Sequence, residues 1–131
     1  MLIRLFIYCL TLMQFLFNPF KAVKIDIEQP YFDFVIDTES HTASLQRLTI
    51  GINERIDVIV PDHITWAGKN FTVNSIHKSA FANSIDRMTG LQIPKTIEKN
   101  ENNKQACQLV VDYSNIPLLE KIDIKEYFEK E

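Results

Sequence analysis

Two proline-ended segments, offset by 33 residues, constrain the fold of this chain more than any other feature. Val58–Ile64 has the sequence VIVPDHI and Leu91–Ile97 has the sequence LQIPKTI. Both place two aliphatic residues two positions apart, then proline, then an aliphatic residue three positions later. A strand with alternate residues inward, ended by a proline that cannot donate to the next ladder position, is a unit that stacks on copies of itself. The repeat therefore predicts a solenoid.

A looser spacing, aliphatic-x-x-aliphatic-x-aliphatic, supports the same interpretation. It is typical of the strands of leucine-rich repeats, whose periods run about 20–29 residues. The spacing occurs at Leu45/Leu48/Ile50, Met88/Leu91/Ile93, Ala106/Leu109/Val111 and Leu119/Ile122/Ile124. We therefore expect strands at 109–111 and 122–124 in addition to those near 58 and 91.

The first half of the chain also carries a β-hairpin pattern. Tyr31–Asp37 alternates, with Phe32 and Phe34 on one face, and a polar turn at 38–42 separates it from Ala43–Ile50. Helical periodicity is weak, and short helices are expected only around residues 78–82 and 125–130.

Size and composition indicate one domain. The chain has 131 residues, of which 46% are hydrophobic and 24% charged, with a net charge of −3. Its three glycines, at positions 51, 68 and 90, are too far apart for a glycine-rich nucleotide loop. Lysine and arginine form no cluster, so nucleic acid is not an expected partner.

The N-terminus has the pattern of a signal peptide. Arg4 precedes an apolar stretch over Leu5–Phe17, which is shorter than the ~20 residues of a membrane-spanning helix. We expect residues 1–22 to be a signal cleaved after Ala22, although Phe20 is bulky for the −3 position. An uncleaved signal-anchor and a buried N-terminal helix are the alternatives. The mature domain would span residues 23–131 and be secreted or displayed on a cell surface.

The two cysteines fit the same division. Cys9 would leave with the signal, so Cys107 would be alone and no internal disulfide would form. Its neighbours, Ala106 and Leu109, predict a buried apolar role for Cys107 rather than a nucleophilic one.

The segment between the two proline-ended strands carries a family resemblance. Residues 68–83 have the sequence GKNFTVNSIHKSAFAN, a G-K-x-aromatic-x-V-x-x-I segment followed by an A-F pair. In this order, with V-x-V-P before and L-x-I-P after, the chain resembles the BspA-like leucine-rich repeat family of surface proteins. The resemblance covers about residues 31–97.

The resemblance implies a fold and a role. The expected fold is a β-rich α/β solenoid of leucine-rich repeat type, short and right-handed, with an N-terminal hairpin cap at about 31–50. The A-F pair would face the core, and such proteins are secreted or surface-bound adhesins that contact host proteins, extracellular matrix or other cells. The expected core is Val58, Val60, Ile64, Val73, Ile76, Ala80, Phe81, Leu91, Ile93 and Ile97.

Two departures from the family pattern stand out. A polar stretch, residues 98–104, replaces the expected turn and A-F pair, so the last repeat after Ile97 is degenerate. His77 stands where the family has glycine, so the turn after Ile76 must be made without positive φ or with a strained residue. The chain is either a minimal member or a shortened form of a longer protein.

No residue pattern indicates catalysis, a metal or a cofactor. Three histidines fit no ligand motif: His41, His63 and His77. Three acidic residues lack the order of a calcium loop: Asp33, Asp37 and Glu39. No G-x-S-x-G occurs, and no serine or cysteine stands beside an activating base.

Strand periodicity places the candidate binding surface. If Val58, Val60, Leu91, Ile93, Ile122 and Ile124 face inward, the intervening residues form an exposed column on the sheet: Ile59, Gln92 and Asp123. Trp66 is either an exposed binding aromatic or a rim residue. Asn70-Phe71-Thr72 is the single N-x-[ST] sequon, and Asn70 is the candidate glycosylation site.

These patterns favour a secreted or cell-surface repeat module that binds a protein or cell-surface ligand and has no catalytic activity. One alternative is a small secreted enzyme or enzyme inhibitor on a β-rich scaffold. Another is the N-terminal part of a longer adhesin, with a structural capping role.

Overall fold

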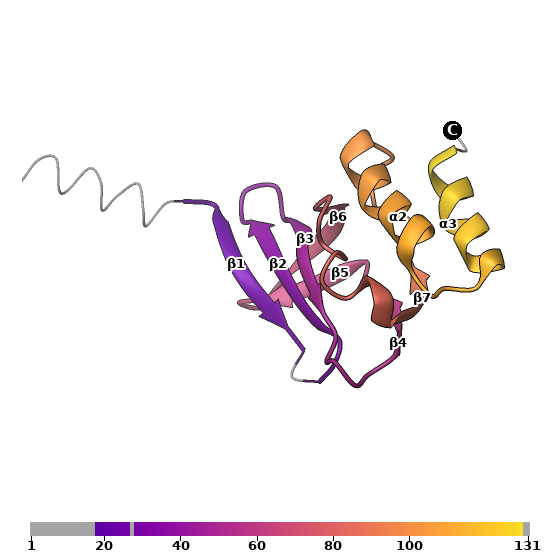
Figure 1. The fold of residues 1–131 in the computed structure, drawn as a ribbon. Helices are drawn as coiled ribbons and strands as arrows, with labels where there is room; N and C mark the ends of the chain where they lie inside the picture. The colour runs from indigo at the N-terminus through magenta and orange to yellow at the C-terminus, as the bar shows by residue number, and fades with distance from the viewer. Residues whose placement is uncertain (1–17, 27, 130–131) are drawn as a thin grey trace, which may run out of the picture.

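The computed structural model describes residues 18–26 and 28–129, which form seven strands, a short 3₁₀ helix and two α-helices (Figure 1). The elements are β1 (Phe20–Ile25), β2 (Tyr31–Asp37), β3 (Thr42–Thr49), β4 (Ile56–Ile59), β5 (His63–Trp66), β6 (Lys69–Ile76), η1 (Ile85–Arg87), β7 (Met88–Gln92), α2 (Glu101–Tyr113) and α3 (Leu118–Glu129). Most of the predicted signal, residues 1–17, lies outside the described residues.

The larger sheet has the order β1-β2-β3-β6-β5 and mixes antiparallel with parallel pairing. β1, β2 and β3 form an antiparallel meander, β6 runs parallel to β3, and β5 pairs antiparallel with β6. The sheet curls around its buried face into a half-barrel. The predicted hairpin at about 31–50 is confirmed as β2 and β3, and β1 extends it on the other side.

A second, two-stranded sheet pairs β4 with β7 in parallel. Val58 lies opposite Leu91 and Ile59 opposite Gln92, so the register equals the 33-residue offset of the sequence repeat. β3 and β6 are parallel at a similar offset, since Ala43 pairs with Val73. The fold is therefore β-rich, with one parallel pairing in each of the two sheets.

One apolar core lies between the two sheets and the helices. β2 buries every second residue, and the rings of Phe32 and Phe34 stack with centroids 6.0 Å apart. Phe81, in the loop that leads to η1, is fully buried in the same core. Alternation along the strands thus puts the aromatic residues where burial contributes most.

A two-residue turn joins β5 to β6. Ala67 and Gly68 both have positive φ, at 50° and 75°. Two consecutive residues in this region form a type I′ turn, whose twist suits a hairpin. The turn determines which side chains of β6 face outward, and it leaves Phe71 buried between exposed Asn70 and Thr72.

The strands predicted at 109–111 and 122–124 are wrong, because these residues lie in α2 and α3. Asn100 caps α2 by accepting a hydrogen bond from the Asn103 N–H (3.0 Å). Ala106, Cys107 and Val110 then share one buried helical face. In α3 the predicted inward pair divides, since Ile124 is buried and Ile122 is 42% exposed. The polar stretch after Ile97 is the start of a helix.

The turn after Ile76 is made without positive φ, so His77 causes no left-handed backbone strain at this position. The helix expected at 78–82 is a series of turns, in which Ala80 N–H donates to His77 O and Ser84 N–H to Phe81 O. η1 follows, three residues later. The helix expected at 125–130 is confirmed over residues 125–129 as the end of α3, which begins at Leu118, and residue 130 lies outside the described residues.

The hairpin of α2 and α3 packs against both parallel strand pairings, at β6 and at β7. Asn103 is fully buried against the edge of β6, where its Oδ1 accepts the Ile76 N–H (2.8 Å). Its Nδ2 donates to the carbonyls of Glu98 (2.8 Å) and Asn74 (3.4 Å). α3 lies beside β7. A side chain and a helix thus occupy the edges that a further strand would need.

Among the helices in the described part of the chain, none has the length and apolar character required to cross a membrane.

Candidate functional site

The three residues of the predicted binding column are neighbours in the structure, but only two of them lie on strands. Ile59 and Gln92 are opposite each other on β4 and β7, and both are exposed. Asp123 is on α3 rather than on a third strand. It nevertheless lines the same groove of about 250 Å³ as Gln92, together with Tyr127. Gln92 therefore lies between the other two residues of the predicted binding surface, Ile59 and Asp123.

The predicted core agrees closely with the observed one. Val58, Val60, Ile64, Val73, Ile76, Ala80, Phe81, Leu91 and Ile97 are all buried. Ile93, the tenth member of that set, is half-buried and packs against the cluster from the groove beside α3. The assignment of faces from strand periodicity holds for β4, β6 and β7.

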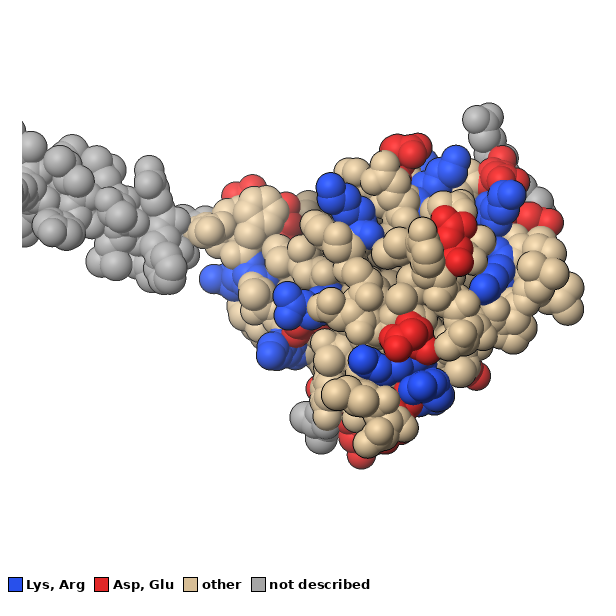
Figure 2. Space-filling model, viewed as in Figure 1, with Lys and Arg blue, Asp and Glu red and all other residues tan. Residues whose placement is uncertain are grey.

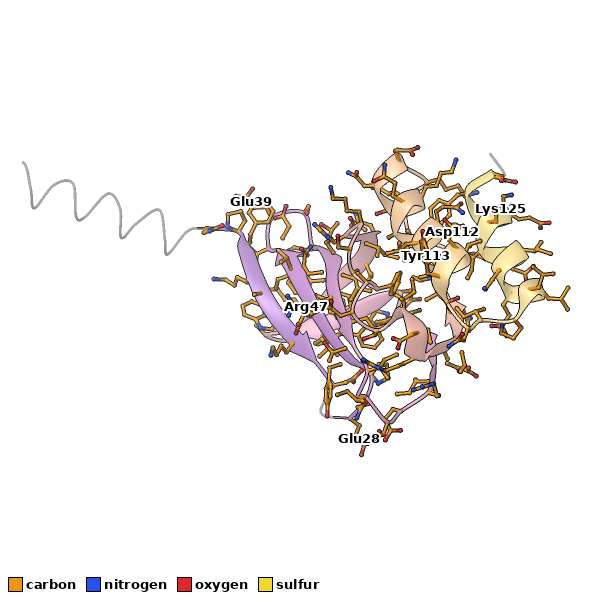
Figure 3. All side chains as sticks on the ribbon, viewed as in Figure 1. Glu28, Glu39, Arg47, Asp112, Tyr113 and Lys125 are labelled. Carbon is orange, nitrogen blue, oxygen red and sulfur yellow. The ribbon has the colours of Figure 1, made fainter. Side chains whose placement is uncertain are left out.

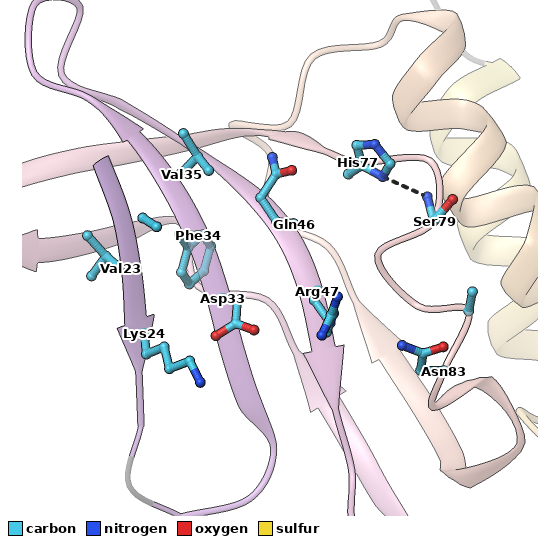
Figure 4. Close-up of a pocket in the computed structure, with 12 residues that line it drawn as sticks. Val23, Lys24, Asp33, Phe34, Val35, Gln46, Arg47, His77, Ser79 and Asn83 are labelled. Atoms are coloured by element: carbon cyan, nitrogen blue, oxygen red, sulfur yellow. Dashed lines mark hydrogen bonds between the residues drawn. The ribbon is translucent and has the colours of Figure 1, made fainter. Parts of the chain in front are cut away.

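A larger hollow, which the sequence did not indicate, lies on the outer face of the curled sheet (Figure 4). Its volume is about 730 Å³, and β1, β2, β3 and the 77–83 loop line it. We call this hollow the trough. Its lining residues are Ala22, Val23, Lys24, Asp33, Phe34, Val35, Gln46, Arg47, His77, Ser79, Ala82 and Asn83.

Three charged residues cross the trough on neighbouring strands. Lys24 of β1 is opposite Asp33 of β2, which in turn is opposite Arg47 of β3. A register shift at Asp33 makes a bulge there and turns both Gln46 and Arg47 toward the trough. Figures 3 and 4 show Arg47 on the sheet face. The row carries a net charge of +1.

The cations of this row are available to a ligand. Within the described residues, neither the Lys24 ammonium nor the Arg47 guanidinium forms an ion pair or hydrogen bond. Both side chains are exposed, whereas Asp33 is half-buried between them. Arg47 therefore keeps its full set of N–H donors for an external acceptor.

The 77–83 loop supplies neutral polar groups to the opposite wall. His77 Nδ1 accepts the backbone N–H of Ser79 (3.1 Å), which leaves Nε2 as the protonated nitrogen of the neutral ring. Asn83 lies further along the loop (Figure 4). Gln46 Nε2 donates to Ser44 Oγ (3.1 Å) and keeps its amide oxygen free within the described residues.

The trough continues toward the start of β1. A second hollow of about 280 Å³ shares Val35 and Gln46 with it. This end presents Phe20, which is 58% exposed, with Asp37 and Asn74. The backbone N–H of Glu39, and then that of Ser40, hold the pKa of Asp37 below its usual value. Asp37 is therefore an ionised acceptor at neutral pH.

The remaining candidate residues lie apart from one another. His63 Nδ1 is 2.6 Å from Asp62 Oδ1 on an exposed part of the surface, and His41 stacks obliquely on Phe71. Trp66 is half-buried and packs edge-on against Phe71 at 6.4 Å, as a rim residue would. No group of three or more potential metal ligands occurs in the residues that the structure describes.

Two titratable groups of the helices have a raised pKa: buried Cys107 and half-buried Tyr127. Burial raises the pKa of the Cys107 thiol to about 12. Burial also raises the pKa of Tyr127, with a smaller contribution from Cys107, and its hydroxyl lies 2.9 Å from Ile97 O and 3.2 Å from Pro94 O. A protonated, enclosed thiol is a poor nucleophile, so Cys107 has a packing role.

Basic and acidic side chains are interspersed on the face shown in Figure 2, without a large area of one sign. No family model, curated protein or solved structure matches the chain.

Proposed function

We propose that this protein is a surface-recognition module of the BspA-like, leucine-rich repeat type, which binds a protein ligand through β4, β7 and the adjoining face of α3. In this proposal the two parallel pairings are two coils of a short right-handed solenoid. Their offsets of 30–33 residues support it. The module would be secreted or displayed on a cell surface and would have no catalytic activity.

The exposure of Ile59 is the observation that carries the binding proposal. Ile59 is 62% exposed at the C-terminal end of the β4–β7 pairing, opposite Gln92 and next to the groove that Asp123 lines. An aliphatic side chain that stands beside polar groups on a rigid ladder is the kind of feature that a protein partner covers. A sheet face also fixes the spacing of its side chains, which favours specific contacts.

Surface binding can be tested with the purified chain and immobilised extracellular-matrix proteins: fibronectin, laminin and collagen. Ile59→Asp should weaken binding to the recognised protein at least tenfold, because it places a charge in the contact. Ile52→Asp is the matched control, since Ile52 is 79% exposed but lies outside β4 and β7. Absence of binding to all three proteins, or equal loss in the two variants, would overturn the proposal.

Export is the second part of the proposal. A signal cut after Ala22 would fall inside β1 and remove three of its six residues, among them Phe20. N-terminal sequencing of the exported protein locates the cut. An intact Met1 on a soluble cytosolic product would refute export.

Asn70 supplies an independent readout of passage through a eukaryotic secretory pathway. Asn70 and Thr72 are exposed on the outer side of β6 while Phe71 is buried, as strand periodicity predicted. Thr65 Oγ1 donates to Asn70 Oδ1 (2.9 Å), and within the described residues the amide nitrogen forms no hydrogen bond. Glycosidase treatment of protein secreted from eukaryotic cells should lower its mass, and Asn70→Gln should abolish the shift.

The contacts of α2 and α3 with the strands argue against a purely structural role in a longer adhesin. Asn103 and the residues before it occupy the edge of β6, and α3 covers β7. A further coil stacked directly on these strands would have to displace them. We therefore favour recognition by this module itself over a purely structural role.

A further inference from the structure

We infer that the trough on the outer face of β1, β2 and β3 binds a carboxylate-bearing oligosaccharide, at a site separate from the proposed protein-binding face. The inference rests on the shape of the trough and on the groups that line it. It does not depend on the proposed protein-binding face, because Ile59, Gln92 and Asp123 do not line the trough. A signal cut after Ala22 would remove Phe20 and Ala22 from the trough, so the inference is made for the full chain.

The size of the trough suits a short sugar chain. Its volume of about 730 Å³ lies within the ~300–1,000 Å³ range of small-ligand sites. It crosses three strands, which lie about 4.8 Å apart, and continues into the hollow beside Phe20. An elongated site of this kind fits two to four linked rings better than a single compact metabolite.

The floor and one end of the trough offer apolar surface to sugar rings. Ala22 and Val35 are opposite each other on β1 and β2 and form a low floor. Phe20, on the same side of β1 as Ala22, exposes 58% of its surface at the far end. Pyranose rings have C–H faces that pack on aliphatic and aromatic side chains, while their edges carry hydroxyl groups.

The walls offer the hydrogen-bonding groups that hydroxyls need. Asp33 and Asp37 are acceptors, Asn83 and Gln46 carry amides, and His77 Nε2 is a donor. Amide side chains can donate to one hydroxyl and accept from another, which matches the dual character of sugar hydroxyls. A mixed wall of this kind is less suited to a phosphate, which requires mainly donors.

The Lys24–Asp33–Arg47 row specifies an acidic sugar. Arg47 has no protein acceptor within the described residues, and its planar guanidinium matches a carboxylate with two parallel N–H bonds. Lys24 adds a second positive charge across the trough. With one carboxylate bound, the row of two cations and one anion would be neutral.

The test is isothermal titration of the full chain with a tetrasaccharide of alternating glucuronate and N-acetylglucosamine. We expect saturable binding that weakens about tenfold or more in Arg47→Ala, as expected for loss of a charged hydrogen-bonding partner. Arg47→Lys should recover only part of the affinity, because an ammonium cannot form the paired bonds. Phe20→Ala should weaken binding by about fivefold through loss of ring contact.

Matched controls separate a built site from general electrostatic attraction. Arg55→Ala removes an exposed cation outside the trough and should change affinity by less than about twofold. The carboxyl-reduced, neutral tetrasaccharide should bind at least tenfold more weakly than the acidic one. Circular dichroism of each variant verifies that the fold is retained.

Four results would overturn the inference. These are no saturable binding, equal loss in Arg47→Ala and Arg55→Ala, equal binding of the acidic and neutral sugars, and tight binding of hexaglutamate without binding of the sugar. The last result would make the trough a site for acidic peptides. Ile59→Asp should leave sugar binding unchanged, so failure of the proposed protein-binding face and failure of the trough are distinguishable.

Discussion

The strands of residues 31–92 and the helices of residues 101–129 bury their apolar side chains to different extents. β2 and β3 bury three residues each with hardly any exposure, and Phe71 and Phe81 complete their core. α3 fully buries only Ile124. It leaves large apolar residues exposed at its start: Leu118, Leu119 and Ile122.

Attachment also differs between the two regions. The strands are held by continuous backbone ladders, whereas the helical hairpin meets them through a few apolar contacts and through polar contacts of Asn103 and Tyr127. Regions with fewer buried contacts open at lower free energy. The comparison indicates a stable β ladder closed by a less stable helical cap.

Phe81→Ala should have the largest effect, because it acts on the ladder's core. Loss of a fully buried ring and the cavity left behind should lower the free energy of unfolding by about 3–5 kcal/mol. Gln92→Ala, on the exposed face, should change it by less than about 0.5 kcal/mol. Denaturant melts measure both. If Phe81→Ala were neutral and Gln92→Ala strongly destabilising, the assigned faces would be wrong.

Asn103→Ala tests the junction between ladder and cap. It leaves the Ile76 N–H and the Glu98 carbonyl without their side-chain partners, so the loss should be on the order of 3 kcal/mol. Asn102, the exposed neighbour, provides the control, and Asn102→Ala should cost less than about 0.5 kcal/mol. Chemical denaturation compares the two. Equal stability of the variants would show that Asn103 does not hold the cap.

Tyr127→Phe acts within the cap and should be milder. Removing the hydroxyl that bonds to the carbonyls of Pro94 and Ile97 should cost about 1 kcal/mol, and Tyr113→Phe on the exposed surface should cost almost nothing. Because the folded pKa of Tyr127 is raised above 10.0, the unfolded tyrosine ionises first as pH rises. Stability should therefore fall above about pH 10, and less steeply in Tyr127→Phe. Melts from pH 7 to 11 would show identical slopes if this assignment were wrong.

Thiol labelling of Cys107 measures opening of the cap with little disturbance of stability. Its pKa of about 12 and its burial in α2 should make reaction with a disulfide reagent at pH 8 on the order of 100-fold slower than in denaturant. A Cys9→Ser chain isolates this thiol. We expect Asn103→Ala to accelerate the reaction more than Gln92→Ala does. Rapid labelling of the parent chain would mean that the helices do not enclose Cys107.

The ladder was predictable because its determinants are local in sequence. A period of two decides which side chains of β2, β4 and β7 are buried, and the repeated proline motif fixed the 33-residue register of Val58 with Leu91. The I′ turn at Ala67 and Gly68 is also local, although Ala67 gave no signal of positive φ. Nine of the ten expected core residues are buried, although Ala80 and Phe81 were expected there from the family resemblance rather than from strand alternation.

The C-terminal region was mispredicted because its aliphatic spacing is compatible with both a strand and a helix. Ala106, Leu109 and Val111 satisfy a strand template, yet Ala106 and Val110 also lie on one helical face. The capping bond from Asn103 N–H to Asn100 Oδ1 starts a helix, and the Asn103 side chain then takes the edge that a third strand would have used. Asp123 lies beside Gln92 because the next helix, α3, places it there.

The sequence by itself thus indicated the hairpin of β2 and β3, the strands near β4, β6 and β7 and their buried faces, because these depend on alternation within each segment. The repeated proline motif added the offset between β4 and β7. The tertiary structure alone decided the helical cap and the trough. Lys24, Asp33 and Arg47 form one row only because antiparallel pairing aligns three strands. His77 joins them only because its loop runs alongside β3, where its N–H donates to Leu45 O. Contacts between distant segments have no short-range signature, because their energy arises only when the core brings the segments together.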